Sequence, residues 1–216
     1  ASTMLMWDPD GNGPREPVLV VGGEFTVAGG VVAYNVAALN LVTGAWSSFG
    51  TGTDGPVYSL TTTASGELVI GGMFATAGGT PANNIARWNG TAWVALGAGT
   101  NGPVYCVKGM PSGELIAGGG FRAAGGIDCS RIARWADDQW SALGQGMNSD
   151  VYALAASNTG ELIAAGLFSA AGTINANSIA RWTGDDWKPL GLGTDGPIYC
   201  LVVAATSELY AGGAFT

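Results

Sequence analysis

Residues 55–100 read GPVYSLTTTASGELVIGGMFATAGGTPANNIARWNGTAWVALGAGT, and this stretch decides the fold because the rest of the chain repeats it. A tyrosine near the start of each copy recurs every 47 residues, as Tyr58, Tyr105, Tyr152 and Tyr199. An Arg-Trp pair keeps the same spacing, as Arg87-Trp88, Arg134-Trp135 and Arg181-Trp182. Self-similarity at a fixed spacing of this size indicates a repeat architecture.

Each repeat contains four segments with strand character, which combine β-branched and aromatic residues between Gly, Pro or Asn boundaries. In the second repeat these segments are residues 57–62, 67–74, 84–89 and 91–96. Asn89-Gly90 separates the last two and favours positive φ at both turn positions, which predicts a tight hairpin. Four short antiparallel strands in a repeat of this length form the blade of a β-propeller, so we predict an all-β propeller fold.

The repeat makes residues 1–216 a single propeller domain. We place four blades and the first two strands of a fifth at about 1–50, 51–100, 101–147, 148–194 and 195–216. Because a blade needs four strands, the simpler expectation is that the chain is a piece of a longer polypeptide. The alternative is that another chain supplies the missing strands by pairing with the open strand edge. That predicted edge includes Glu208, Leu209, Tyr210 and Phe215.

The composition limits the partners and the location. The net charge is −8 and only 11% of residues are charged. An acidic chain lacks the basic face that nucleic acids and anionic lipid surfaces require, so we expect neither as a partner. No run of 18 apolar residues occurs, so we expect no membrane insertion. Low charge with abundant Gly, Thr, Ser and Asn is typical of extracellular β-proteins, so we expect an extracellular or cell-surface location.

The pattern LxxGGxFxxAGG, followed by NxIARWxGxxWxxLGxG, carries a family resemblance. It resembles the propeller repeats of large secreted bacterial proteins and of fungal cell-polarity cortical markers. It is also similar to kelch repeats and to the propeller of galactose oxidase. The resemblance covers nearly the whole chain and implies a propeller in a surface or secreted protein. The chain departs from galactose oxidase because it contains no histidine, and the His ligands of that copper site are therefore missing.

The residue types give no basis for catalysis. Without histidine, neither a Ser-His-Asp triad nor a Cys-His pair can form. The three cysteines are scattered, and Cys106 and Cys200 occupy the same position of alternate repeats, so we expect neither a zinc site nor a disulfide. Two carboxylate pairs fall in hairpin positions, Asp137-Asp138 and Asp185-Asp186. We read these pairs as solvated turns and predict a non-enzyme with no catalytic residue, cofactor or metal.

The repeated tryptophans and arginines are predicted to pack the blades together. The tryptophans are Trp46, Trp93, Trp140 and Trp187. We expect them between adjacent blades with the indole N–H bonded to a carbonyl, and the alternative is a set of stacking platforms for sugars. The arginines are Arg87, Arg134 and Arg181. We expect them to stack on aromatic rings or to bond backbone carbonyls, and the alternative is a ring of guanidinium groups for an anionic ligand.

A side-chain oxygen recurs just before each later first strand, in Asp54, Asn101, Asn148 and Asp195. As a ring these oxygens offer ligands for calcium, but Asx residues in such loops are ordinary turn formers, and we favour that interpretation. Asn89-Gly90-Thr91 is a glycosylation sequon on the predicted hairpin tip, which makes Asn89 a candidate glycosylation site.

The leading functional hypothesis is an extracellular or cell-surface scaffold for protein contacts or self-assembly, including a filament or surface layer. Its expected partners are other protein chains, copies of this chain among them. The alternative is a carbohydrate-binding module that uses aromatic residues to hold glycans. A galactose-oxidase-like enzyme ranks third and is disfavoured by the absence of histidine.

Overall fold

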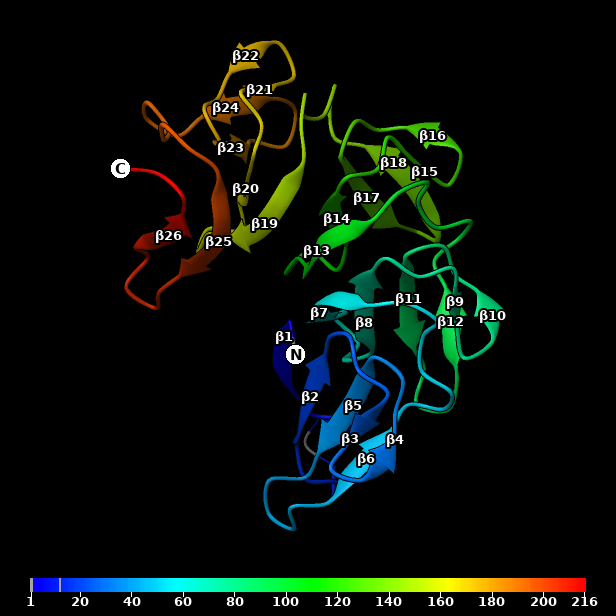
Figure 1. Ribbon diagram of the computed structural model, residues 1–216. Coiled ribbons are helices and arrows are strands. Elements are labelled where there is room, and N and C mark those ends of the chain that lie inside the picture. Colours follow the sequence, from blue (N-terminus) through cyan, green and yellow to red (C-terminus); the bar gives the residue numbers. More distant parts are fainter. Residues whose placement is uncertain (1, 12) are drawn as a thin grey trace.

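The computed structural model describes residues 2–11 and 13–216. Figure 1 shows antiparallel sheets that follow one another around an arc, and each sheet is one repeat. Four blade sheets have four strands, hydrogen-bonded in chain order from the inside of the arc outward, and the sheet of the fifth repeat has two strands; four small hairpins form further two-stranded sheets. The predicted all-β propeller fold is therefore confirmed. This part of the chain contains no helix that is long and apolar enough to cross a membrane.

Each strand position repeats from blade to blade. The inner strands are β1 (Thr3–Trp7), β7 (Val57–Thr62), β13 (Val104–Gly109), β19 (Val151–Ala156) and β25 (Ile198–Val203). The second strands are β2 (Val18–Gly22), β8 (Leu68–Gly72), β14 (Leu115–Gly119), β20 (Leu162–Gly166) and β26 (Leu209–Gly213). The third strands are β5 (Val36–Leu39), β11 (Ile85–Trp88), β17 (Ile132–Ala136) and β23 (Ile179–Trp182). The outer strands are β6 (Trp46–Ser48), β12 (Trp93–Ala95), β18 (Gln139–Ala142) and β24 (Trp187–Pro189).

A small hairpin that the sequence did not predict lies between the second and third strands of each complete blade. Its strand pairs are β3 (Val27–Ala28) with β4 (Val31–Val32), β9 (Thr76–Ala77) with β10 (Thr80–Pro81), β15 (Ala123–Ala124) with β16 (Ile127–Asp128), and β21 (Ala170–Ala171) with β22 (Ile174–Asn175). In the second blade the turn is Gly78-Gly79, with φ of 62° and 78°. Two successive positive φ angles define the favoured hairpin turn, which explains the Gly-Gly of the repeat.

The turn at Asn89-Gly90 differs from the prediction. Gly90 has a φ of 97°, whereas Asn89 is not among the residues with positive φ. Asn89 instead uses its Oδ1 atom to accept hydrogen bonds from the N–H groups of Thr91 and Ala92, at 3.1 and 2.9 Å. The turn with two positive φ angles occurs one blade later, at Asp137 and Asp138. Asn therefore caps this hairpin through its side chain, and the prediction for its backbone was wrong.

The inner strands of the later blades carry a β-bulge at the repeated tyrosine. The pairing of β7 with β8 shifts between Val57 and Ser59, and equivalent shifts occur in β13, β19 and β25. A bulge leaves one residue without a direct partner and redirects its side chain. Tyr58 and its counterparts are these redirected residues.

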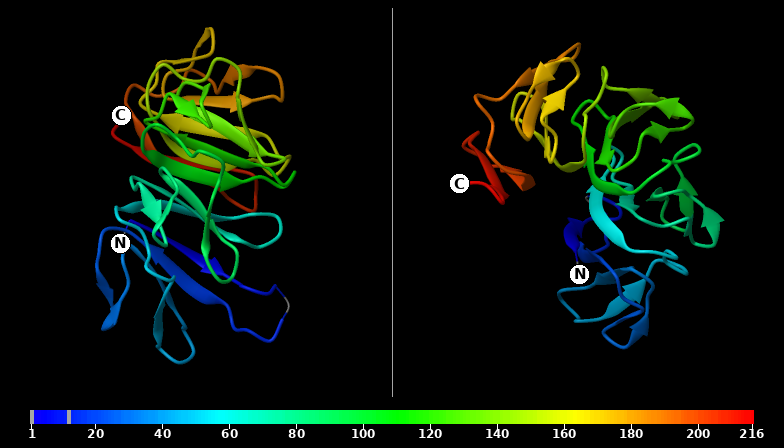
Figure 2. Two further views of the ribbon diagram at one scale, coloured as in Figure 1. Left: turned by 90° about the vertical axis from the view of Figure 1, so that its right-hand side faces the viewer. Right: turned by 45° about the horizontal axis from the view of Figure 1, so that its top comes forward.

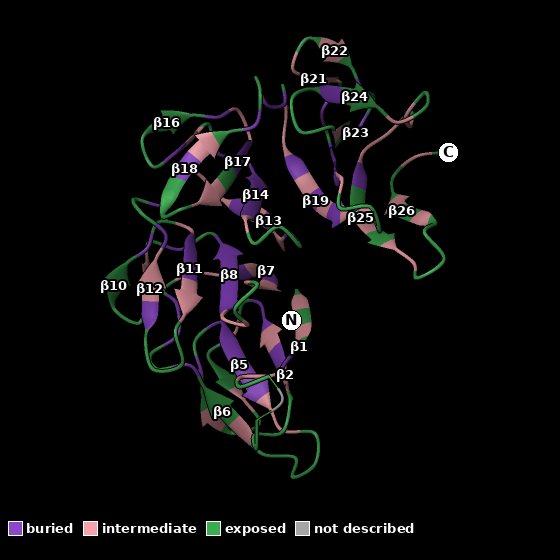
Figure 3. Cartoon of the chain, turned by 180° about the vertical axis from the view of Figure 1, so that it is seen from behind, coloured by how far each residue is buried: buried purple, intermediate pink, exposed green. Residues whose placement is uncertain are grey.

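The second strands form the centre of the blades. Every residue of β8, β14 and β20 is buried, and Figure 3 shows β8 and β14 in the colour of buried residues. Their nearly continuous apolar sequence is typical of a strand covered on both faces. The core lies between blades, because Val36 of the first blade and Val57 and Ile70 of the second belong to one hydrophobic cluster.

The fifth repeat leaves apolar residues uncovered. Tyr210 on β26 is 57% exposed, whereas Ile116 and Ile163 at the equivalent positions are 1% and 7% exposed. Within the described residues β26 pairs with β25 alone. The right-hand view of Figure 2 shows β1 and β26 at the two open ends of the arc. The difference in burial follows from the position, since the earlier second strands lie under the next blade.

Candidate functional site

Three of the four repeated tryptophans lie between blades. Trp93, Trp140 and Trp187 are 5%, 5% and 4% exposed. Each indole Nε1 donates a hydrogen bond to a carbonyl of the preceding blade: Phe49 O at 3.0 Å, Leu96 O at 2.8 Å and Leu143 O at 2.9 Å. Buried indoles with occupied N–H groups present no open face to a sugar. Trp46 is half-buried, and within the described residues no other blade packs on that side of it.

The repeated arginines have different partners from those predicted. Each forms an ion pair with a glutamate of its own blade: Arg87 with Glu67 at 2.8 Å, Arg134 with Glu114 at 3.4 Å and Arg181 with Glu161 at 3.1 Å. The side chains of these arginines are between 36% and 45% exposed, so each pair contributes about 0–1 kcal/mol. The prediction of aromatic or carbonyl partners was therefore wrong. A carboxylate beside each guanidinium also removes the free positive charge that an anionic ligand would need.

The recurring Asx residues before the inner strands hold loops together. The Oδ1 atom of Asp54 accepts hydrogen bonds from the N–H groups of Ala75 and Thr76, both at 2.9 Å. Asn101 and Asn148 make equivalent bonds one and two blades later, and Asp195 accepts hydrogen bonds from the N–H and the hydroxyl group of Thr216. These oxygens act as loop acceptors, the behaviour of turn formers. No cluster of potential metal ligands occurs within residues 2–11 and 13–216.

Replacing Asp54 by asparagine is expected to keep the fold and to remove one source of acid sensitivity. Burial would raise the pKa of Asp54, but hydrogen bonds from Thr76 and Ala75 outweigh burial and lower this pKa below 3.8. A lowered folded-state pKa stabilises the fold above pH 3.8, and the stabilisation is lost as pH falls through the folded pKa. Denaturant melts of both proteins between pH 3 and pH 6 measure the effect. If the difference in unfolding free energy between the native protein and Asp54→Asn did not change with pH, the assigned pKa shift of Asp54 would be contradicted.

The cysteines are all free thiols, and two of the three are buried. Burial raises the pKa of Cys129 to about 11 and places that of Cys106 higher still. Cys200 is exposed on the last blade. Cys106 and Cys129 therefore lack the accessible setting in which a thiolate is activated.

Iodoacetamide at pH 8 is therefore expected to label Cys200 quickly, and to label Cys106 and Cys129 only after denaturant is added. A pKa of about 11 leaves about a hundredfold less thiolate than the unshifted value of 9.0. Peptide mass spectrometry over a time course measures the three rates. Equal rates at all three positions in the folded protein would contradict the expectation.

Four tyrosines form a continuous row along the inner strands, which we call the tyrosine row. The ring centroids lie 5.9 Å apart from Tyr58 to Tyr105, 5.5 Å from Tyr105 to Tyr152, and 5.7 Å from Tyr152 to Tyr199. The rings are tilted by 47°, 48° and 53°, within the range of favourable aromatic pairs. The first three side chains are half-buried and Tyr199 is exposed. The sequence marked these tyrosines as repeat positions without indicating that they contact one another.

A charged pair lies beside the tyrosine row. Arg131 Nε lies 3.6 Å from Asp150 Oδ1, and Arg131 Nη1 donates a hydrogen bond to Gly120 O. Both residues depart from the repeat. The positions equivalent to Arg131 are Asn84 and Ser178, and those equivalent to Asp150 are Pro56, Pro103 and Pro197. Burial and the nearby carboxylate of Asp150 raise the pKa of Tyr105 and Tyr152 above 10.0. Both phenols are therefore neutral at pH 7 and can donate hydrogen bonds.

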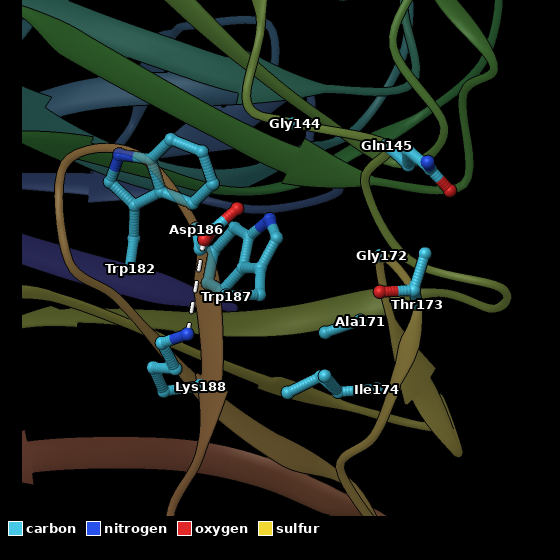
Figure 4. Close-up of a pocket in the computed structure, with 10 residues that line it drawn as sticks. All are labelled: Gly144, Gln145, Ala171, Gly172, Thr173, Ile174, Trp182, Asp186, Trp187 and Lys188. Atoms are coloured by element: carbon cyan, nitrogen blue, oxygen red, sulfur yellow. Dashed lines mark ion pairs between the residues drawn. The ribbon is translucent and has the colours of Figure 1, made fainter.

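A pocket of about 330 Å³ lies at the outer edge of the fourth blade, where the third blade meets it (Figure 4). The indoles of Trp182 and Trp187 line one side, with ring centroids 5.2 Å apart. Thr173, next to the first residue of β22, lines the opposite side. The Nζ atom of Lys188 lies 3.8 Å from Oδ2 of Asp186, and both side chains are accessible. We call this site the Trp182 pocket.

A similar pocket of about 280 Å³ lies one blade earlier. Its lining includes the residues that precede those of the Trp182 pocket by 47 positions: Gly97, Gly125, Ile127, Trp135, Gln139 and Trp140. The sequence did not predict either pocket, because each is assembled from two blades and a small hairpin. The sequence did contain one indication of these pockets, the tryptophan of the repeated Arg-Trp pair, which lines both of them as Trp135 and Trp182.

Comparisons with known proteins bear on the fold. No family model matches the chain, and no curated protein matches its sequence. The extracellular domain of a hybrid two-component system from B. thetaiotaomicron matches with a TM-score of 0.64 and 12% identity, over 92% of this chain and 25% of that chain. The WD40 propeller domain of Doa1 matches with a TM-score of 0.61 and 10% identity, over 91% and 57%.

A chain of the mitotic checkpoint complex matches with a TM-score of 0.60 and 17% identity, over 96% of this chain and 55% of that chain. This chain therefore spans between a quarter and somewhat more than half of the length of these neighbours. At such identities the similarity shows the fold alone, which is that of a β-propeller. The resemblance to kelch and cortical-marker repeats stays a prediction.

Proposed function

We propose that this chain is a non-catalytic propeller scaffold that binds a protein partner along the tyrosine row. The observation that carries the proposal is the row itself, four rings in contact across four blades with Arg131 and Asp150 beside two of them. Tyr and Arg are enriched at protein interfaces and among the residues that dominate binding energy. The neighbours that share this fold include a WD40 domain and a chain of a multiprotein complex, which agrees with this use of the fold.

The blade geometry supports a binding surface at this place. A bulge leaves Tyr58 and its counterparts without a direct partner in the neighbouring strand and redirects their side chains. Arg131 and Asp150 are absent from the other blades, so the propeller does not require them. A rigid aromatic strip with hydroxyl donors and one charged pair suits an extended peptide segment with apolar and polar side chains.

Selection of peptides from a random display library against the folded protein tests this proposal. We expect selected peptides to slow amide exchange in β13 and β19, and to bind Tyr105→Ala at least about tenfold more weakly, as at an interface hot spot. Tyr34→Ala is the matched control, because Tyr34 is exposed but lies outside the tyrosine row. Peptides that protect other strands and bind Tyr105→Ala unchanged would contradict the proposal.

We propose further that the domain works outside the cell or at its surface. The low fraction of charged residues supports this location, and a solved neighbour with the same fold is an extracellular domain. Asn89 is exposed on its hairpin and its Oδ1 atom is fixed by Thr91, so the sequon lies at an accessible turn. Expression with a secretion signal in a glycosylating host tests whether the domain folds after export, and mass spectrometry of the secreted protein tests whether Asn89 carries a glycan. Failure to be secreted in folded form would count against the location.

Self-assembly is a second proposal, carried by the exposed strand β26. Tyr199, Val202 and Tyr210 are 55%, 59% and 57% exposed on the last hairpin, an unusual amount of exposed apolar surface. We propose that another chain, including a second copy of this one, pairs along Glu208, Leu209, Tyr210 and Phe215. Sedimentation velocity over a range of concentrations measures the association, and Tyr210→Lys should weaken it by charging the edge. A monomer at every concentration would count against association between copies.

A further inference from the structure

The Trp182 pocket has features that the propeller itself does not need. Trp182 is half-buried and contributes an indole surface to the pocket, whereas the buried Trp187 already makes the bond between blades through Leu143 O. Asp186 and Lys188 have side chains 75% and 51% exposed, and they contribute a carboxylate and an ammonium group to the lining. Figure 4 shows these groups around the same space as Thr173.

Comparison of the two pockets shows which lining residues the blades need for packing and which they do not. The pocket of the third blade keeps both tryptophans, Trp135 and Trp140, at the same 5.2 Å separation. Its polar positions are different, since Gln139, Ser141 and Gly126 occupy the places of Asp186, Lys188 and Thr173, and its one carboxylate is that of Asp138. The blades therefore need the tryptophan pair, but they fold with either polar set. Only the fourth blade combines an aromatic surface with a carboxylate, an ammonium and a hydroxyl group.

We propose that the Trp182 pocket binds a neutral hexopyranoside unit of a glycan. The apolar C–H face of a pyranose packs on an indole, while its hydroxyl groups require donors and acceptors at the ring edge. Asp186 accepts hydrogen bonds from two neighbouring hydroxyl groups, and Lys188 and Thr173 donate to sugar oxygens. A volume of about 330 Å³ lies at the small end of the range for ligand pockets, roughly 300–1,000 Å³.

Charge narrows the ligand class. A net charge of −8 disfavours sulfated or uronic-acid polysaccharides, because the protein as a whole repels polyanions. A quaternary ammonium group is the other ligand that tryptophan and a carboxylate hold well. Lys188 opposes it, because its positive charge lies 3.8 Å from the carboxylate that such a ligand would use. A neutral sugar is repelled neither by the net negative charge nor by Lys188.

The site differs from the proposed protein-binding surface. The tyrosine row lies on the inner strands, whereas the Trp182 pocket lies on the outer strand β24 and the small hairpin of β21 and β22. The pocket also differs from the sugar platform that the sequence suggested, because that platform used the buried Trp187 and its counterparts. The available aromatic surface belongs to the other tryptophan of the pair.

Saturation-transfer NMR with four methyl pyranosides tests the proposal, using the glucoside, galactoside, mannoside and N-acetylglucosaminide. We expect at least one of them to bind with a Kd on the order of 1 mM, typical of a small, exposed site. Asp186→Asn and Lys188→Ala should each weaken binding about tenfold, the effect of removing a charged hydrogen-bond partner. Both side chains are exposed, so neither change should disturb the fold.

Asp185→Asn is the matched control, because Asp185 belongs to the same turn and carries the same charge but does not line the pocket. Binding that survives Asp185→Asn and falls in Asp186→Asn and Lys188→Ala supports the proposal. Three results would overturn it. These are no saturation transfer to any of the four pyranosides, equal binding by all variants, or tetramethylammonium binding that is tighter than sugar binding and is strengthened by Lys188→Ala.

Discussion

Replacing Trp140 by alanine is expected to lower the free energy of unfolding by about 3–5 kcal/mol, the loss typical of a fully packed aromatic residue. Trp140 is 5% exposed, and its Nε1 atom bonds Leu96 O of the preceding blade at 2.8 Å. It also packs against Trp135 at a ring separation of 5.2 Å. Truncation therefore creates a cavity between two blades and leaves a buried carbonyl without its donor.

Urea unfolding followed by circular dichroism measures the loss, with the slope m fitted for each variant to detect partial unfolding. Trp46→Ala is the matched control, because Trp46 holds the same repeat position in the first blade but is half-buried. We expect Trp46→Ala to cost at most about half as much as Trp140→Ala, in line with the smaller area lost. Equal costs at the two positions would contradict the assignment of Trp140 to packing between blades.

Much of the fold could be predicted because the repeat superimposes several weak signals. A single strand such as residues 57–62 has modest alternation, but its pattern recurs with the same tyrosine every 47 residues. The structure gives this strand the same bounds, as β7, Val57–Thr62. The third strand is shorter than predicted, since β11 covers Ile85–Trp88 and the flanking asparagines belong to turns. The ends of strands depend on turn geometry, which alternation does not report.

The small hairpins could not be predicted because strands of two residues show no alternation. Gly78-Gly79 carries a turn signal, but the flanking residues of β9 and β10 are not strongly apolar. The arginine partners were missed for a related reason. Glu67 and Arg87 are 20 residues apart in the chain. The register of β8 with β11 pairs Arg87 with Val69, which brings Glu67, two residues before Val69, within reach of the guanidinium. Register is set by tertiary pairing rather than by local pattern.

The charged residues that distinguish the two candidate sites lie where the copies differ, so the repeat pattern alone did not reveal them. Averaging over blades emphasises residues that recur in the blades, such as Trp140 and the glycines at the end of the second strand. Arg131 and Lys188 each occur once, so they disappear from the consensus. They become informative only after the structure shows what surrounds them, the tyrosine row in one case and the Trp182 pocket in the other.

The second glycine of the Gly-Gly pair lies close to the backbone of the inner strand. It is present in all five copies, as Gly23, Gly72, Gly119, Gly166 and Gly213. A Cβ atom on Gly119 would lie 2.1 Å from Pro103 O, and one on Gly72 would lie 2.2 Å from Pro56 O. These carbonyls are held by the bulge of the inner strand, where Pro103 O accepts a hydrogen bond from the N–H of Gly120 at 2.9 Å. The obstacle is therefore backbone, which cannot rotate away as a side chain can.

Gly119→Ala is accordingly expected to cost at least about 3 kcal/mol, the upper part of the range for overpacking, because it must displace the bulge beside Tyr105. Gly119 does not have a positive φ, so the cost is steric rather than conformational. Gly118→Ala is the matched control, expected to cost about 1 kcal/mol. Its Cβ would meet the side chains of Val151 and Cys106, and the fourth blade already carries Ala165 in this position. Urea unfolding of both variants decides the matter, since a smaller loss for Gly119→Ala than for Gly118→Ala would show that the bulge yields more easily than the side chains.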